Sequence, residues 1–211
     1  MIRAPADQRV QQARERRSSD EARSFYRKWA ADYDADIAGT LKFTGGTDIA
    51  KMLAQGLTNR PSRIVDLGCG TGLVGAELQR LGYTDLDGID LSAEMLDVAR
   101  SKGIYQKLIE ADLLKPLDIA DGTYDAAISA GTFTTGHVNA LRLSEFLRII
   151  KPEGWLACVI ASDFWRPGGF APAIDRLQSE GLIATFQYTI LPISETDTAT
   201  AHFCLVMAGQ P

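Results

Sequence analysis

The pattern of hydrophobic and polar positions changes its period along the chain. Near the N-terminus, apolar residues recur three or four positions apart, which is typical of an amphipathic helix. The first such stripe consists of Ala22, Phe25, Tyr26 and Trp29. Ser18 and Glu21 stand just before it in capping-box spacing, so we expect a helix to begin there. A second stripe, over residues 49–56, precedes a break at Asn59-Arg60-Pro61.

From residue 63 onward, short apolar runs alternate with helical stripes. The runs predict five buried strands, over residues 63–67, 86–90, 105–111, 124–129 and 155–161. Ser92 is placed to cap a helix over residues 93–102. Alternation of this kind predicts a parallel sheet with helices on both faces.

The C-terminal part departs from this alternation. A helix with apolar positions over residues 170–177 ends near Gly181, and two period-2 runs follow over residues 186–190 and 203–207. Two consecutive strands without a helix between them form a hairpin. The sequence therefore predicts an α/β fold with a doubly wound, seven-stranded, mostly parallel sheet and an antiparallel C-terminal hairpin strand.

The candidate chemistry lies at the carboxyl ends of the first three strands, where open α/β sheets bind ligands. The turn Asp66-Leu67-Gly68-Cys69-Gly70-Thr71-Gly72 lets a ligand approach the backbone and opens a helix whose N–H groups favour electron-rich partners. Asp90 ends the second strand, where a carboxylate can accept hydrogen bonds from both hydroxyls of a ribose. Asp112 follows the third strand and could accept a bond from an adenine amino group.

Two cofactor classes fit this arrangement. Gly70-Thr71-Gly72-Leu73-Val74-Gly75 has the form GxGxxG, and Asp90 lies 20 residues beyond Gly70, as in a dinucleotide-binding fingerprint. From Asp66, the same turn has the form D-x-G-x-G-x-G, which resembles motif I of the class I S-adenosylmethionine (SAM)-dependent methyltransferases. Later segments resemble that family's further motifs in order: Gly88-Ile89-Asp90-Leu91-Ser92, Ala111-Asp112-Leu113, Tyr124-Asp125 and Ile150-Lys151-Pro152-Glu153-Gly154.

The resemblance covers about residues 20–208 and implies a Rossmann-like fold, SAM as cofactor and S-adenosylhomocysteine (SAH) as product. Residues 29–34 and 130–138 are further similar to the methyltransferase-like proteins named for the Williams–Beuren chromosomal region. The resemblance implies cofactor contacts from each motif, with Asp90 on the ribose and Asp112 on the adenine. The complete implied set is Tyr33, Asp66, Gly68, Cys69, Gly70, Gly72, Asp90, Leu91, Met95, Asp112, Leu113, Ala130 and Gly131.

Methyl transfer from a sulfonium depends mainly on positioning, so a catalytic base is optional. His137 follows the fourth strand and either deprotonates an acceptor or is a loop histidine bonded to backbone. His202 lies within the last strand's pattern and is expected to be structural. Phe133 and Trp165 either line an apolar acceptor pocket or pack in the lid and core. We expect no metal, because the segment after the fourth strand lacks the acid that metal-dependent catechol methyltransferases carry there.

Composition sets the remaining expectations. A chain of 211 residues and 22.9 kDa fits one globular domain, and no apolar run approaches the roughly 18 residues of a membrane span. The three cysteines predict neither a disulfide framework nor a zinc site, so a reducing cytoplasm is expected. Residues 1–30 carry eight Lys/Arg against four Asp/Glu, and lack a signal-peptide core. We therefore expect a flexible Arg-rich tail over residues 1–18 and a single domain over 19–211, with a helical lid at 19–58.

The function expected from these observations is a SAM-dependent methyltransferase that acts on O, N or S of a small molecule, as a monomer or homodimer. The net charge of −5 argues against a nucleic-acid partner, and no membrane partner is expected. Two alternatives remain open at this stage. One is an NAD-type oxidoreductase, based on the GxGxxG segment, and the other is a non-catalytic SAM-binding regulatory protein.

Overall fold

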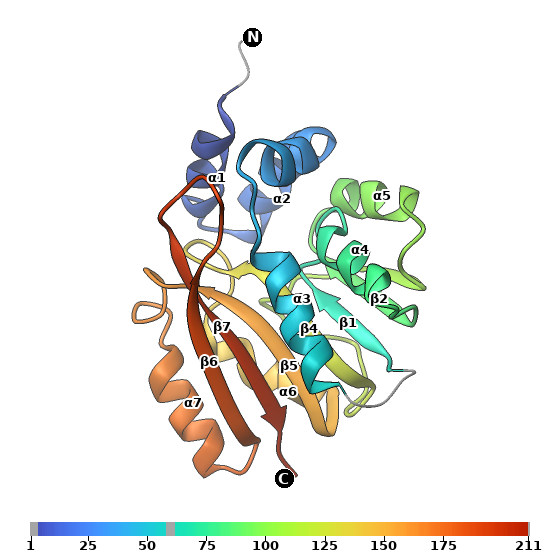
Figure 1. Cartoon of the computed structure of the whole chain (residues 1–211), viewed down its shortest axis with the longest axis vertical. Helices are drawn as coiled ribbons and strands as arrows, with labels where there is room; N and C mark the ends of the chain where they lie inside the picture. The colour runs from blue at the N-terminus through green and yellow to red at the C-terminus, as the bar shows by residue number, and fades with distance from the viewer. Residues whose placement is uncertain (1–3, 58–61, 211) are drawn as a thin grey trace.

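The computed structural model describes residues 4–57 and 62–210, so the predicted break at residues 59–61 lies outside the described residues. Helices and strands alternate through most of the chain (Figure 1). In chain order the elements are α1 (Ala6–Arg14), α2 (Ser19–Trp29), η1 (Ala30–Asp32), η2 (Ala35–Thr40), α3 (Gly45–Gly56), β1 (Ile64–Leu67), α4 (Leu73–Arg80), β2 (Leu86–Asp90), α5 (Ala93–Ser101), β3 (Lys107–Glu110), β4 (Tyr124–Phe133), η3 (Ala140–Arg142), α6 (Leu143–Arg148), β5 (Ile150–Ala161), α7 (Phe170–Ser179), β6 (Ile183–Pro192) and β7 (Thr200–Ala208).

The strands form one seven-stranded sheet in the order β3-β2-β1-β4-β5-β7-β6. The pairs from β3 to β5 are parallel, whereas β7 pairs antiparallel with both β5 and β6. This topology confirms the predicted doubly wound sheet with an antiparallel hairpin strand. Several strand boundaries differ from the prediction. β3 is confined to Lys107–Glu110, β5 begins at Ile150, and β4 continues past Ser129 through an irregular stretch and still pairs with β5 at Phe133.

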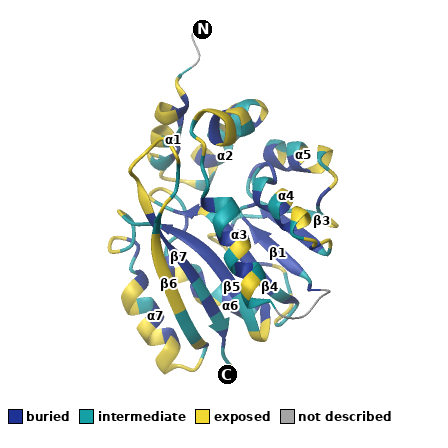
Figure 2. Cartoon of the chain, in the orientation of Figure 1, coloured by how far each residue is buried: buried dark blue, intermediate teal, exposed yellow. Residues whose placement is uncertain are grey.

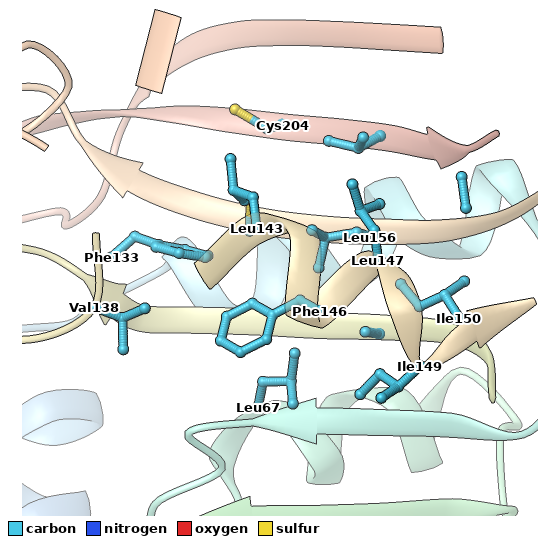
Figure 3. Close-up of a cluster of buried hydrophobic side chains, with 14 of the residues drawn as sticks. Leu67, Phe133, Val138, Leu143, Phe146, Leu147, Ile149, Ile150, Leu156 and Cys204 are labelled. Carbon is cyan, nitrogen blue, oxygen red and sulfur yellow. The ribbon is translucent and has the colours of Figure 1, made fainter. Parts of the chain in front are cut away.

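Helices cover both faces of the sheet, as predicted. α3 and α4 pack on one face through a core that includes Leu53 and Leu78. α6 and α7 cover the other face, and Figure 3 shows its cluster around Phe146. Figure 2 shows the central strands buried and the edge strand β6 largely exposed. Because α3 contacts β4 and β5 directly, it belongs to this helical layer and not to the lid predicted for residues 19–58.

Both predicted N-caps are present. The Ser18 side chain accepts a hydrogen bond from the Glu21 backbone N–H at 3.2 Å and begins α2. Ser92 accepts from the Met95 N–H at 3.4 Å and begins α5. Each cap satisfies one N–H of the first helical turn that has no partner within the helix. No helix in residues 4–57 and 62–210 is both long and apolar enough to cross a membrane.

The structure differs from the prediction of a flexible tail over residues 1–18. Residues 6–14 form α1, which lies with α2 beyond one end of the sheet (Figure 1). Ala13 packs in a small core with Trp29 of α2 and Ile37 of η2. The Arg9 guanidinium is buried and lies 2.9 Å from the Asp36 carboxylate. The basic character of this segment suggested solvation, but at Arg9 the charge is paired with a buried acid.

Candidate functional site

A cavity of about 320 Å³ lies between the N-terminal helices and the carboxyl ends of β1, β2 and β4. A volume of this size is at the lower end of the range for small-molecule sites. The structure brings most of the predicted site residues together around it. Those that line the cavity are Tyr33, Gly68, Gly70, Asp90, Leu91, Met95, Asp112, Leu113, Ala130, Gly131 and His137.

The predicted aromatic residues of the acceptor pocket do not line this cavity. Phe133 is 1% exposed and packs edge-on against Phe170. Figure 3 shows Phe133 within the buried hydrophobic cluster. Trp165 stacks on His202 with 4.2 Å between ring centroids. Both residues therefore pack against other aromatic rings, as the alternative of lid and core packing predicts, and neither lines this cavity. The reason at Phe133 is that β4 continues to that position, so its side chain joins the packing beneath α6 and α7.

Glycines shape the floor of the cavity. Gly68 has φ +77°, and a Cβ there would lie 2.3 Å from the Thr132 hydroxyl. At Gly70 and Gly131, which also have positive φ, an added Cβ would meet nothing within 4 Å. The close approach of Thr132 therefore demands glycine at one position. At the other two, the missing side chains leave open space beside the cavity.

The Asp90 carboxylate ties the glycine turn to the end of β2. Its two oxygens accept hydrogen bonds from the backbone N–H groups of Gly70 and Ser92, each at 2.9 Å. Burial raises the pKa of Asp90 above its usual value, and these backbone bonds oppose the rise. Each carboxylate oxygen has a second acceptor site, so Asp90 can still accept hydrogen bonds from a ligand.

Asp112 connects the other side of the cavity to α2. Its carboxylate accepts a hydrogen bond from the Ser19 hydroxyl at 2.7 Å and from the Leu114 backbone N–H at 2.9 Å. Arg16 and Arg17, within the predicted tail, also line the cavity. The sequence analysis did not identify Arg16, Arg17 or Ser19 as site residues. Ser19, for example, lies 93 positions from Asp112, and no local pattern links the two.

Asp34 holds the N-terminal segment to the glycine turn. The Thr71 hydroxyl donates to one oxygen of Asp34, and the Lys102 ammonium lies 2.6 Å from the other. The walls of the cavity are therefore held together by contacts between side chains from distant parts of the sequence.

Tyr26 and His137 face each other across the cavity lining. The Nδ1 atom of His137 lies 3.1 Å from the Thr135 carbonyl, so Nδ1 carries the proton and donates it there. Nε2 is then the acceptor for the Tyr26 hydroxyl, at 2.8 Å. Burial lowers the pKa of His137, which keeps the imidazole neutral near pH 7, and burial raises that of Tyr26. Tyr26 is a site residue that the sequence analysis placed only in a helical stripe.

Asp66, Cys69 and Gly72 belong to the glycine turn but do not line the cavity. The Asp66 carboxylate is buried and accepts a hydrogen bond from the Tyr105 hydroxyl at 2.7 Å. Burial raises the pKa of Asp66 to about 7, and the Tyr105 bond opposes the rise. Gly75, the last glycine of GxGxxG, faces Tyr105, because a Cβ there would lie 2.3 Å from the Tyr105 hydroxyl. This position therefore serves internal packing.

The remaining predictions concern His202 and a metal site. His202 is buried against Trp165, and burial lowers its pKa, which agrees with a structural role. Among the described residues, no group of three or more His, Cys, Asp or Glu side chains is arranged to hold a metal ion.

Comparison with known proteins gives the class of protein. Residues 64–154, which carry the glycine turn and the acids after β2 and β3, match the family model described as a methyltransferase domain. The chain belongs to the class I SAM-dependent methyltransferases, as the order of its motifs predicted.

Individual relatives extend this result. The chain is 36% identical to methyltransferase-like protein 27 from Homo sapiens over 165 residues, which cover 75% of this chain and 66% of that protein. It is 38% identical to a demethylmenaquinone methyltransferase from Corynebacterium kroppenstedtii over 125 residues, 57% of this chain and 52% of the relative. The chain thus spans about half to two thirds of the length of these relatives.

A solved structure shares the fold. It is a chain from the complex between the Haloferax volcanii Trm112 methyltransferase activator and a methyltransferase, with a TM-score of 0.65 and 20% identity. The match covers 88% of this chain and 98% of that one.

Proposed function

We propose that this protein transfers the methyl group of SAM to an O, N or S atom of a small molecule. One observation carries the proposal. Glycines, acids and small residues from four separate sequence motifs, all typical of the family, line a single cavity at the carboxyl end of the sheet. In open α/β sheets this is the end at which ligands bind.

The cavity fits an adenosyl cofactor. Gly70 and Gly131 leave open space where side chains would stand, and Asp90 offers free acceptor sites for the two ribose hydroxyls. Asp112 and Leu113 would meet the adenine, with Leu91 and Met95 at its faces, while Tyr33 and Ala130 would flank the methionine part. When bound, SAM supplies an electrophilic methyl group on a sulfonium.

Tyr26 and His137 are the groups we assign to the acceptor. The acceptor's proton would pass to the Tyr26 oxygen as Tyr26 gives its own proton to Nε2 of His137, which leaves an imidazolium bonded to the Thr135 carbonyl. The lowered pKa of His137 supports this role, since a neutral imidazole can take the proton. His137 therefore remains the proposed base, and Tyr26 is the group through which it acts.

A small acceptor fits a cavity of about 320 Å³ and the net charge of −5, and an RNA acceptor is the contrary outcome of the test. The NAD-type alternative is disfavoured, because residues 64–154, which contain the GxGxxG segment, match a methyltransferase domain.

Calorimetric titration with SAH, with NADH in parallel, tests the cofactor. Binding of SAH without NADH is expected, and the reverse would refute the proposal. Incubation with labelled SAM and either a metabolite panel or total RNA then tests the acceptor. Label in a metabolite is expected, whereas label in RNA alone would contradict the small-molecule part. SAH binding with no methyl transfer in either arm would favour the regulatory alternative.

A further inference from the structure

The Tyr105 side chain occupies a position behind the glycine turn that the proposed function does not use. Tyr105 precedes β3 in the sequence, but its ring reaches beneath the start of α4 and its hydroxyl lies 2.7 Å from Asp66 at the end of β1. It therefore links the segment before β3 to the end of β1, past the intervening strand β2, directly behind the turn that lines the cavity.

Two glycines make this position possible. A Cβ at Gly75 would lie 2.3 Å from the Tyr105 hydroxyl oxygen and 2.5 Å from Cζ, and a Cβ at Gly72 would lie 3.1 Å from Cε2. Any side chain at Gly75 would overlap the Tyr105 hydroxyl. The ring is thus fitted between the turn and α4, and its hydroxyl has one acceptor, Asp66.

Asp66 needs this contact. Its carboxylate is 1% exposed, and one of its oxygens, Oδ1, has no hydrogen-bond partner among residues 4–57 and 62–210. α4 begins at Leu73, its N-cap Gly72 provides no side-chain cap, and the nearby backbone amide of Gly75 favours the ionised form of Asp66. A buried carboxylate with few donors depends strongly on each one it has.

We propose that Tyr105 is a positioning residue for the cofactor-binding turn: its hydroxyl holds Asp66 and its ring fills the space left by Gly72 and Gly75, which fixes the turn in its binding shape. The inference rests on the proposed function, because the ligand that reports on the turn is SAH.

The ionisation of Asp66 supplies a test that separates this role from simple packing. The groups that face Asp66 are Tyr105 from the turn before β3, Cys69 from the glycine turn, Asp90 from β2 and the Gly75 amide from α4. With the pKa of Asp66 at about 7, the carboxylate loses its charge just below neutral pH, and the Tyr105 bond weakens with it. SAH affinity should therefore decline as the pH falls through 7.

The experiment is calorimetric titration of the full chain with SAH from about pH 6 to about pH 9, a range that brackets this titration. Tyr105→Phe keeps the ring and removes the donor. Its affinity at the alkaline end should drop about threefold to tenfold, the usual effect of one lost hydrogen bond. Because the lost bond favours ionised Asp66, the midpoint of the decline should also move to higher pH. Gly75→Ala, which displaces the ring, should weaken binding in the same direction.

Tyr188→Phe is the matched control, since Tyr188 is 54% exposed on β6. Thermal unfolding of each variant checks the fold. If Tyr105→Phe has the affinity and the pH profile of Tyr188→Phe, the inference is overturned and the proposed function stands. If the wild type binds no SAH at any pH, both are overturned.

Discussion

The two sides of the cavity differ in how the sequence encodes them. On the sheet side, between residues 64 and 133, each functional group lies at or near the carboxyl end of a strand, which is a fixed point of a repeating pattern. On the N-terminal side, between residues 4 and 41, the walls are held by single contacts between distant side chains, such as Ser19 with Asp112 and Thr71 with Asp34. One side of the site is therefore encoded in local sequence patterns and the other in long-range side-chain contacts. Only the first side can be predicted from a single sequence.

The largest effect is expected when the ion pair that anchors α1 is disrupted, which tests whether long-range contacts hold the N-terminal side in place. Arg9 is 8% exposed and Asp36 is 5% exposed, and Asp36 also accepts a hydrogen bond from the Trp29 indole at 2.7 Å. Arg9→Ala leaves Asp36 buried without its cation, so we expect the free energy of unfolding to fall by about 3–5 kcal/mol. Urea unfolding measures the loss, and hydrogen exchange should locate it in residues 6–40.

Arg14→Ala is the control for that variant. Arg14 pairs with Asp163, but the two side chains are 34% and 61% exposed, so its removal should cost less than about 1 kcal/mol. If Arg9→Ala costs as little stability as Arg14→Ala, α1 contributes little to the fold, as the prediction of a flexible tail held.

The next largest effect is expected for SAH binding on the sheet side. Asp90→Ala removes the acceptor proposed for the ribose and leaves hydroxyls unpaired in the site, so SAH affinity should drop by about 1–3 kcal/mol. Calorimetry measures it, and Asp97→Ala on the outside of α5 serves as control, since the Asp97 side chain is 70% exposed. Wild-type affinity in a folded Asp90→Ala protein would refute the ribose assignment.

The sheet side of the cavity could be predicted from the sequence for a physical reason. Buried parallel strands appear as apolar runs, helices appear as 3.6-period stripes, and ligand groups lie at strand ends. The alternation of strands and helices and the positions of Gly70, Asp90 and Asp112 therefore followed from local patterns. The same patterns misplaced Phe133, because the irregular pairing of β4 with β5 leaves no mark on the sequence. The sequence analysis assigned Tyr105 to a strand. Its hydrogen bond to Asp66 could not be predicted, because it depends on packing across three elements.

A smaller effect should follow from loosening the N-terminal wall at the cavity itself. Ser19→Ala removes the hydroxyl that donates to Asp112, so we expect faster hydrogen exchange in the first turn of α2 and a loss of SAH affinity of about 0.5–1.5 kcal/mol. Ser179→Ala, at the end of α7, removes an exposed hydroxyl far from the cavity and should change neither quantity. If the two variants behave alike, the Ser19 contact does not help to close the site.

The smallest effect concerns the point where the two sides meet, at Tyr26 and His137. The pKa of His137 is lowered in the folded protein, mainly by burial, so the unfolded chain takes up a proton first as the pH falls through 6.5, its ordinary value. Protonation then favours unfolding, and His137 makes the protein less stable at acid pH without affecting it at pH 8.

His137→Gln should therefore flatten the fall in unfolding free energy between about pH 7 and pH 5, the interval set by the ordinary histidine pKa. The raised pKa values of Asp66 and Asp90 act in the opposite direction, but they are present in both proteins and cancel in the difference between the two curves. SAH binding at pH 8 should be preserved, because we assign His137 to the acceptor. Loss of SAH binding in a folded His137→Gln protein would instead place His137 on the cofactor side, and the proton route through Tyr26 would fall with it.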